Sequence, residues 1–210
     1  MGFAIRHPIK RIIDDQYDFL LSMLDRFPYL LEEWVKKQEE EVVEMAESVA
    51  EGDYEVYSSV YRNEIRRIES CYNEEQLFYQ SMLIMVYAYY ESSLLKLAKE
   101  NQVTTPRASL IAAKFGVTLD QELMDISEFL FKTISPLRNQ LCHNNSGTLF
   151  EKSSESERKC IDELVRKKVI AVDDGRITFI DKVFIKKTLD DEYKLLIKLA
   201  DICGYKNRIV

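Results

Sequence analysis

The chain has 210 residues, of which 46% are hydrophobic and 31% charged, a balance typical of a globular protein with a sizeable core. Its formal net charge of -7 argues against sequence-independent binding of nucleic acid over a broad basic surface. A small catalytic site remains compatible with this charge, because it needs only a few arginines around one phosphate. No apolar run reaches the roughly 18 residues of a membrane span, and the N-terminus lacks a secretory signal. We therefore expect a cytoplasmic protein without a membrane partner.

The apolar periodicity, together with few glycines (6) and prolines (4), predicts an all-α fold with long helices. Pro28 is expected to separate the first two helices, and Gly52 with Asp53 as N-cap marks the next break. Short β-type runs around a turn at 173–176 predict one small hairpin at about 169–180, near the C-terminus. The expected helices cover residues 8–27, 29–50, 54–72, 73–99, 106–116, 119–133, 135–143, 157–168 and 181–203. They form a single helical bundle over residues 1–210, with the strongly apolar helix 73–99 at its centre.

The four cysteines, Cys71, Cys142, Cys160 and Cys203, form no Cys-x-x-Cys pair, and we expect reduced thiols. With only two histidines in the chain, no cluster has the spacing of metal ligands, so neither a metal nor another cofactor is expected. Cys142 stands beside His143. Because neighbours on a helix point about 100° apart, a thiol nucleophile activated by that imidazole is disfavoured.

Three arginines, Arg62, Arg66 and Arg67, lie near one another on the predicted helix 54–72. They are the most concentrated basic cluster in the chain, and one interpretation is that they bind RNA and lead it toward an active site. The other interpretation pairs them with the acidic helix 29–50, which contains three consecutive glutamates at 39–41.

Glu91 is a carboxylate within the most apolar helix, directly after Tyr89 and Tyr90. A carboxylate on a central helix is seldom buried unless it is paired, and Arg138 is an available partner. The alternative is an unremarkable surface glutamate on the polar stripe of this helix.

The segment 137–144 reads Leu-Arg-Asn-Gln-Leu-Cys-His-Asn and is the most informative motif of the chain. The dipeptide at 135–136, Ser-Pro, predicts an N-cap and first helical residue, and the helix should end at about His143. Helical spacing places Leu137 and Leu141 on one buried face, with Asn139 and His143 on the opposite face. The motif therefore points toward solvent or a partner, which fits a functional site, although an exposed helix of this kind can also be a merely solvated face.

The combination Arg138-Asn139-Gln140-Leu141-Cys142-His143 resembles the HEPN superfamily, whose members carry Arg-x4–6-His on a late core helix, often with asparagine after the arginine. The preceding Tyr-Tyr-Glu-Ser at 89–92 is similar to the helix that supplies a polar residue near the site in many members. The resemblance covers about residues 73–145. It implies a helical bundle that acts as a homodimer and works as a metal-independent endoribonuclease, often a toxin or phage-defence effector with a neutralising antitoxin. A tyrosine that is nucleotidylated in one subgroup is replaced here by Asn145, so control by that route is not expected.

Under this hypothesis the ribose 2′-OH attacks the adjacent phosphorus, and a 2′,3′-cyclic phosphate is formed. His143 acts as general base or general acid, Arg138 stabilises the negative charge of the transition state, and Asn139 orients the imidazole or binds phosphate. Glu91 and Asn144 are supporting residues. The competing hypothesis is a non-catalytic helical module of the same superfamily that binds nucleic acid or a protein partner, which the acidic charge balance favours.

Overall fold

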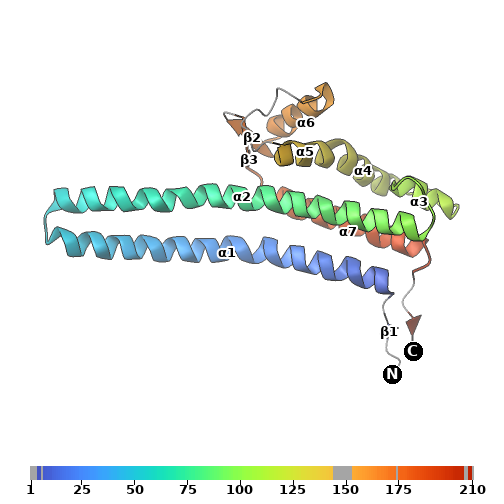
Figure 1. The fold of residues 1–210 in the computed structure, drawn as a ribbon, viewed down its shortest axis with the longest axis horizontal. Coiled ribbons are helices and arrows are strands. Elements are labelled where there is room, and N and C mark those ends of the chain that lie inside the picture. The colour runs from blue at the N-terminus through green and yellow to red at the C-terminus, as the bar shows by residue number, and fades with distance from the viewer. Residues whose placement is uncertain (1–3, 6, 144–152, 174, 206–207, 210) are drawn as a thin grey trace. The chain divides into compact units, whose positions relative to one another are not determined.

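The computed structural model describes residues 4–5, 7–143, 153–173, 175–205 and 208–209 (Figure 1). The side chains of residues 4–5, 67, 69–73, 143 and 208–209 also lie outside this description. The α-helices are α1 (Pro8–Ala50), α2 (Tyr54–Glu100), α3 (Ala108–Lys114), α4 (Gln121–Phe129), α5 (Ser135–His143), α6 (Glu155–Arg166) and α7 (Val183–Ile202), and a π-helical segment, η1, covers Leu130–Ile134. The antiparallel pairs are β2 (Ile170–Asp173) with β3 (Arg176–Phe179), and β1 (Ala4–Ile5) with β4 (Arg208–Ile209). The fold is thus all-α, with the predicted hairpin near the C-terminus.

Two compact units divide the chain. Unit 1 contains Met1–Leu21 and Gln80–Val210, and unit 2 contains Ser22–Tyr79. Helices α1 and α2 each contribute residues to both units. The single domain expected over residues 1–210 therefore stays a prediction.

Unit 2 is a helical hairpin made from the end of α1 and the start of α2 (Figure 1). Gly52 adopts a φ of 94°, a conformation that glycine reaches without steric cost and that reverses the chain between the helices. Asp53 then caps α2 as predicted, because its Oδ1 accepts hydrogen bonds from the backbone N–H groups of Glu55 (2.9 Å) and Val56 (3.3 Å).

Neither predicted break within the long helices occurs. Helix α1 continues through Pro28 to Ala50. Proline removes only the hydrogen bond to the carbonyl of residue 24, and the stacking of Phe27 on Phe78, with 3.9 Å between ring centroids, holds the chain there. Helix α2 likewise runs through residue 73, since it contains no glycine or proline and a break would cost backbone hydrogen bonds.

In unit 1, the second half of α2 lies in the core, as predicted for this apolar stretch. Leu83, Val86 and Leu97 are all 0% exposed. Helices α3 and α4 contact α7, and α5 contacts α6, which in turn contacts β2. Helix α6 begins with a capping box, in which Ser154 and Glu157 satisfy each other's backbone N–H groups.

The chain stays helical from Gln121 through His143, because α4, η1 and α5 follow one another without interruption. The predicted N-cap at Ser135 is therefore wrong: Ser135 has the helical angles φ -57° and ψ -49°. Pro136 cannot donate a hydrogen bond to the preceding turn, and the wider π-helical turn directly before it accommodates the missing donor. The Arg138–His143 segment consequently forms the last turns of a continuous helix rather than the start of a new one.

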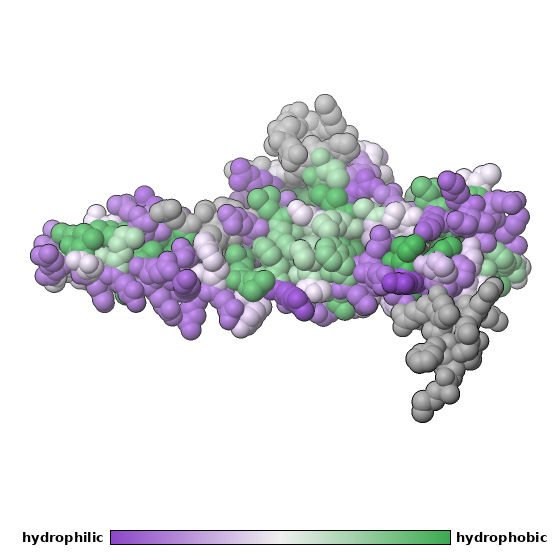
Figure 2. Space-filling view, turned by 60° about the horizontal axis from the view of Figure 1, so that its bottom comes forward, coloured by the Kyte–Doolittle hydropathy of each residue, from purple (hydrophilic) through white to green (hydrophobic). Residues whose placement is uncertain are grey.

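Large apolar side chains are exposed on unit 2. Leu30, Trp34 and Leu77 are 58%, 46% and 59% exposed, and Figure 2 shows hydrophobic patches among hydrophilic side chains along the hairpin. Within the described residues, no helix combines the length and the apolar character needed to cross a bilayer.

Candidate functional site

Arg138 is held at the surface of unit 1 by two residues of helix α2. Its Nη2 forms an ion pair with the Oε2 of Glu91, and its guanidinium carbon lies 5.0 Å from the centre of the Tyr87 ring. The structure thus combines the two alternatives for Glu91, which is paired with Arg138 and is also exposed at the surface. Because the Arg138 side chain is 25% exposed and that of Glu91 49%, solvent reduces the energy of the pair, but the two contacts together fix where the guanidinium lies.

Tyr87 connects this arginine to the helix that carries it. The ring is buried, and its hydroxyl interacts with the side chain of Ser135, the first residue of α5. Burial raises the pKa of the Tyr87 phenol above its ordinary value, so this side chain stays neutral at physiological pH. Tyr87 is therefore a neutral aromatic platform for the Arg138 guanidinium.

The faces of helix α5 are arranged as the spacing predicted. Leu137 is 0% exposed and Leu141 8% exposed, so both belong to the core, whereas Asn139 is partly exposed. Gln140 is buried as well, and its Oε1 accepts a hydrogen bond from the Ser153 hydroxyl at 3.0 Å. This contact ties α5 to the segment before α6 and was not foreseen, because a glutamine in a polar motif gives no signal of burial.

His143 belongs to α5 and is its last described residue, so the predicted end of the helix lies at the edge of the described residues and stays a prediction. Its imidazole lies outside the described residues, and so does the whole of Asn144. The structure therefore gives the backbone position of the motif histidine, five residues after Arg138 on the same helix, and leaves the roles of His143 and Asn144 as predictions.

Arg62 and Arg66 lie on the unit 2 part of α2, and both are exposed. Together with Ser58, Ser59 and Asn63 they line a shallow groove. Within the described residues neither arginine forms an ion pair, so pairing with the acidic stretch of α1 is not observed. Arg67 belongs to the same helix, but its side chain is not described. These arginines belong to a different unit from Arg138. That they and Arg138 form one RNA-binding surface therefore stays a prediction.

Glu192, on helix α7, is a buried residue that the sequence reasoning missed. It is 0% exposed, and neither carboxylate oxygen has a hydrogen-bond partner among the described residues. Burial raises the pKa of its carboxyl well above the ordinary value, and the charges of Asp191 and Glu91 act in the same direction. The signal was present in the helical spacing, because Glu192 stands between Leu189 and Leu196 on the inward face, yet it ends a run of three acidic residues that resembles a solvated surface.

The described cysteines do not form a site. Cys142 is exposed, Cys203 is partly buried, and the buried Cys160 donates a hydrogen bond to the carbonyl of Thr133 at 3.4 Å. Burial raises the pKa of the Cys160 and Cys203 thiols to about 11, which makes both poor nucleophiles at neutral pH. In the part of the chain that the structure describes, no three His, Cys, Asp or Glu residues gather into a group able to hold a metal ion.

The site therefore consists of an anchored, partly exposed guanidinium on the helix that also carries the motif histidine, next to a buried tyrosine. The core of the same unit contains one carboxyl, that of Glu192, without a hydrogen-bond partner among the described residues. Such an arrangement can bind a phosphate. Compared with known proteins, the chain matches no protein-family model, no curated protein and no solved structure.

Proposed function

We propose that the chain is a metal-independent endoribonuclease of the HEPN type. The observation that carries the proposal is the anchoring of Arg138 by Glu91 and Tyr87, five residues before His143 on one helix. Within the described residues only the Nη2 of Arg138 is hydrogen-bonded, so the remaining N–H groups of its five-donor guanidinium are available for phosphate oxygens.

The reaction is a transesterification within the RNA chain. The ribose 2′-oxygen forms a bond to phosphorus while the bond from phosphorus to the 5′-oxygen breaks, which gives a 2′,3′-cyclic phosphate and a 5′-OH. One imidazole takes the proton of the 2′-OH and another gives a proton to the leaving 5′-oxygen, and two protomers of a homodimer supply one His143 each. Arg138 stabilises the negative charge of the transition state, Asn139 donates to a phosphate oxygen or orients the imidazole, and Glu91 holds Arg138 in place.

His143 acts as the acid in one protomer and as the base in the other, because an imidazole can both give and take a proton near neutral pH. Asn144 follows directly and is a further supporting residue. An enzyme that acts on cellular RNA works in the cytoplasm. Its activity requires restraint by an antitoxin or regulatory partner, as expected of a toxin or phage-defence effector.

The test is cleavage of labelled RNA by the purified chain in the presence of EDTA. We expect His143→Ala to lower the rate by about 10²–10⁴-fold, as for loss of a general acid–base group, and Arg138→Ala by about 10²–10³-fold, as for loss of a charge aimed at the transition state. The new 5′ ends should accept a kinase-transferred phosphate without prior phosphatase treatment, because they carry free hydroxyl groups.

His7→Ala is the matched control for the histidine. His7 is the other histidine of the chain, and its ring stacks on Tyr205 with 4.4 Å between centroids. The control variant should cleave at the wild-type rate. The proposal is wrong if EDTA abolishes cleavage, if DNA is cut as readily as RNA, or if His143→Ala is as active as His7→Ala.

A second candidate is a non-catalytic module that binds a protein or nucleic acid. The exposed Leu30, Trp34 and Leu77 of unit 2 favour it, since exposed apolar surface often marks an interaction site. Expression in bacteria separates the two functions: the enzyme slows growth only when His143 is present, whereas a module affects growth equally with His143→Ala and leaves no RNA fragments.

A further inference from the structure

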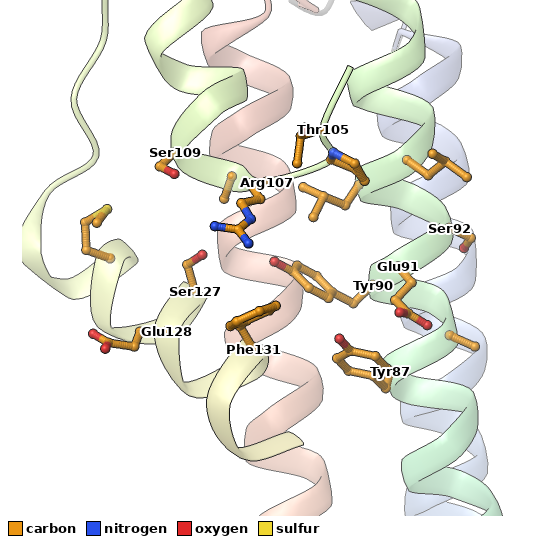
Figure 3. A pocket seen from close by; sticks show the side chains of 16 residues that line it. Tyr87, Tyr90, Glu91, Ser92, Thr105, Arg107, Ser109, Ser127, Glu128 and Phe131 are labelled. Carbon is orange, nitrogen blue, oxygen red and sulfur yellow. The ribbon is translucent and has the colours of Figure 1, made fainter. Parts of the chain in front are cut away.

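A cavity of about 890 Å³ opens in unit 1 between helix α2, the segment before α3, and the α4–η1 helix. Its volume lies in the range of small-molecule and cofactor sites. Figure 3 shows the rings of Tyr87, Tyr90 and Phe131 on its walls, with Arg107 reaching in toward Ser127. Phe131 is 61% exposed, so part of its aromatic surface is accessible to a ligand.

Arg107 is the cation of this cavity that no carboxylate neutralises. Its guanidinium carbon lies 5.2 Å from the centre of the Phe131 ring, and within the described residues it forms no ion pair. The two carboxylates on the cavity wall already have cationic partners: Glu91 pairs with Arg138, and Glu128 pairs with Lys132. The cavity thus combines an aromatic surface with an available positive charge, which matches a planar ring that carries an anionic group.

The cavity adjoins the candidate site through two shared residues. Glu91 and Tyr87 line the cavity, and the same two residues hold Arg138. When a phosphate of an RNA strand lies on Arg138, the neighbouring base or phosphate of that RNA is therefore within reach of the cavity. Hydroxyl groups of Ser109 and Ser127 on the walls supply donors and acceptors for the edges of a base.

We propose that this cavity binds the nucleotide next to the scissile phosphate, with its base against Phe131 and its own phosphate on Arg107. This assignment rests on the proposed ribonuclease function. Single-stranded nucleic acid is commonly held by aromatic side chains that stack on bases and by arginines on the backbone. Phe131 and Arg107 provide one of each in a single cavity.

The test uses a fluorescein-labelled 2′-O-methyl RNA oligomer, which lacks the attacking 2′-OH and cannot be cleaved, with fluorescence anisotropy as the measurement. We expect Arg107→Ala to raise the Kd about 10- to 100-fold, from loss of charged hydrogen bonds. Phe131→Leu keeps apolar volume but removes the ring, and should raise the Kd about fivefold or more. The matched controls are Arg166→Ala, an exposed arginine away from the cavity, and Phe19→Leu, whose ring is 56% exposed; both should bind as the wild type does.

Unlabelled competitors identify the ligand. A nucleoside 5′-monophosphate should displace the oligomer, whereas the nucleoside without phosphate should displace it at least tenfold less well, since it has nothing to place on Arg107. Equal displacement by both, or unchanged binding by Arg107→Ala and Phe131→Leu, overturns the assignment. If the monophosphate binds as tightly as the oligomer, the cavity belongs to a free nucleotide and the assignment to the RNA substrate is wrong.

Failure of the nuclease proposal gives a different pattern. A chain that does not cleave RNA but binds the 2′-O-methyl oligomer through Arg107 and Phe131 lacks the proposed activity and keeps a nucleotide-binding cavity. A chain that cleaves RNA while Arg107→Ala and Phe131→Leu bind and cleave normally has the activity without this cavity's participation.

Discussion

Units 1 and 2 are built partly from the same two long helices, yet they differ in how deeply they bury apolar side chains. The largest fully buried side chains of the described residues all belong to unit 1 and include Ile13, Leu97 and Leu137. Unit 2 instead leaves Leu30 58% and Tyr54 79% exposed. One continuous helix can therefore pack as a core element over one part of its length and present an open surface over another.

This difference suggests different roles for the two units, folding stability for unit 1 and binding of a partner for unit 2. Burial of apolar surface is the main favourable contribution to folding, so unit 1 should provide most of the free energy of unfolding and a rigid frame for Arg138. The exposed apolar residues of unit 2 contribute little to folding and are available for a partner. Three predictions, taken from the largest expected effect to the smallest, test this comparison.

Replacement of Leu97 by alanine should be the most damaging of these substitutions. Leu97 is 0% exposed, and removing a fully buried leucine side chain costs about 2–5 kcal/mol of unfolding free energy. Leu30→Ala, which truncates a side chain that is 58% exposed in unit 2, should cost less than about 0.5 kcal/mol. Urea unfolding followed by circular dichroism measures both values, and similar losses for the two variants would contradict the comparison.

Glu192→Met tests how far the interior of unit 1 tolerates a charge. The folded pKa of Glu192 is raised by burial, so between the ordinary glutamate pKa of about 4.3 and this raised value the folded state binds more protons than the unfolded state. The unfolding free energy of the wild type therefore falls as pH rises through that window. Asp191, Glu91 and Tyr90 share the surroundings and offer no positive charge to offset this.

We expect Glu192→Met to be more stable than the wild type by about 1–3 kcal/mol at pH 8, because an apolar side chain of similar size replaces an unpaired buried carboxyl. The gain should shrink toward pH 5, where the Glu192 carboxyl is increasingly protonated in both states. Glu100→Met, at the exposed end of α2, is the control and should follow the pH dependence of the wild type. A gain that is the same at pH 5 and pH 8 would mean that Glu192 does not titrate in this range.

The sequence predicted the elements better than their ends. Apolar periodicity is a local signal, so the helices, the β2–β3 hairpin and the buried positions Leu137 and Leu141 followed from it. The expected breaks at Pro28, at residue 73 and at Ser135 were wrong because helical hydrogen bonding and packing outweighed local preference at each place. Local propensity is a weak guide wherever tertiary contacts support the helix.

The candidate site was only partly predictable for a related reason. Arg138 and Glu91 are 47 residues apart, and the sequence left two alternatives for Glu91 because only packing of α5 against α2 brings them together. The cavity with Arg107 and Phe131 depends in the same way on how the helices meet. Motif spacing identifies residues that share one helix, whereas contacts between helices become visible only in the folded chain.

The smallest expected effect concerns Arg62 and Arg66, whose role in leading RNA toward the site is a prediction. If both arginines contact phosphates, the double variant Arg62→Ala with Arg66→Ala should bind 2′-O-methyl RNA with a weaker dependence on salt. The slope of log Kd against log salt concentration should fall by about 0.7 for each lost contact. Affinity should fall severalfold at low salt and hardly at all at high salt, with unfolding unchanged because both side chains are exposed.

Lys36→Ala with Lys37→Ala is the matched control, since it removes the same charge from unit 2. Those lysines already pair with Glu40 and Glu41, at 4.0 Å and 3.6 Å, so their loss should change the salt dependence less. Equal slopes for the two double variants would mean that net charge alone governs the effect. An unchanged slope in the arginine variant would remove unit 2 from the RNA-binding surface and leave its exposed apolar residues to a protein partner.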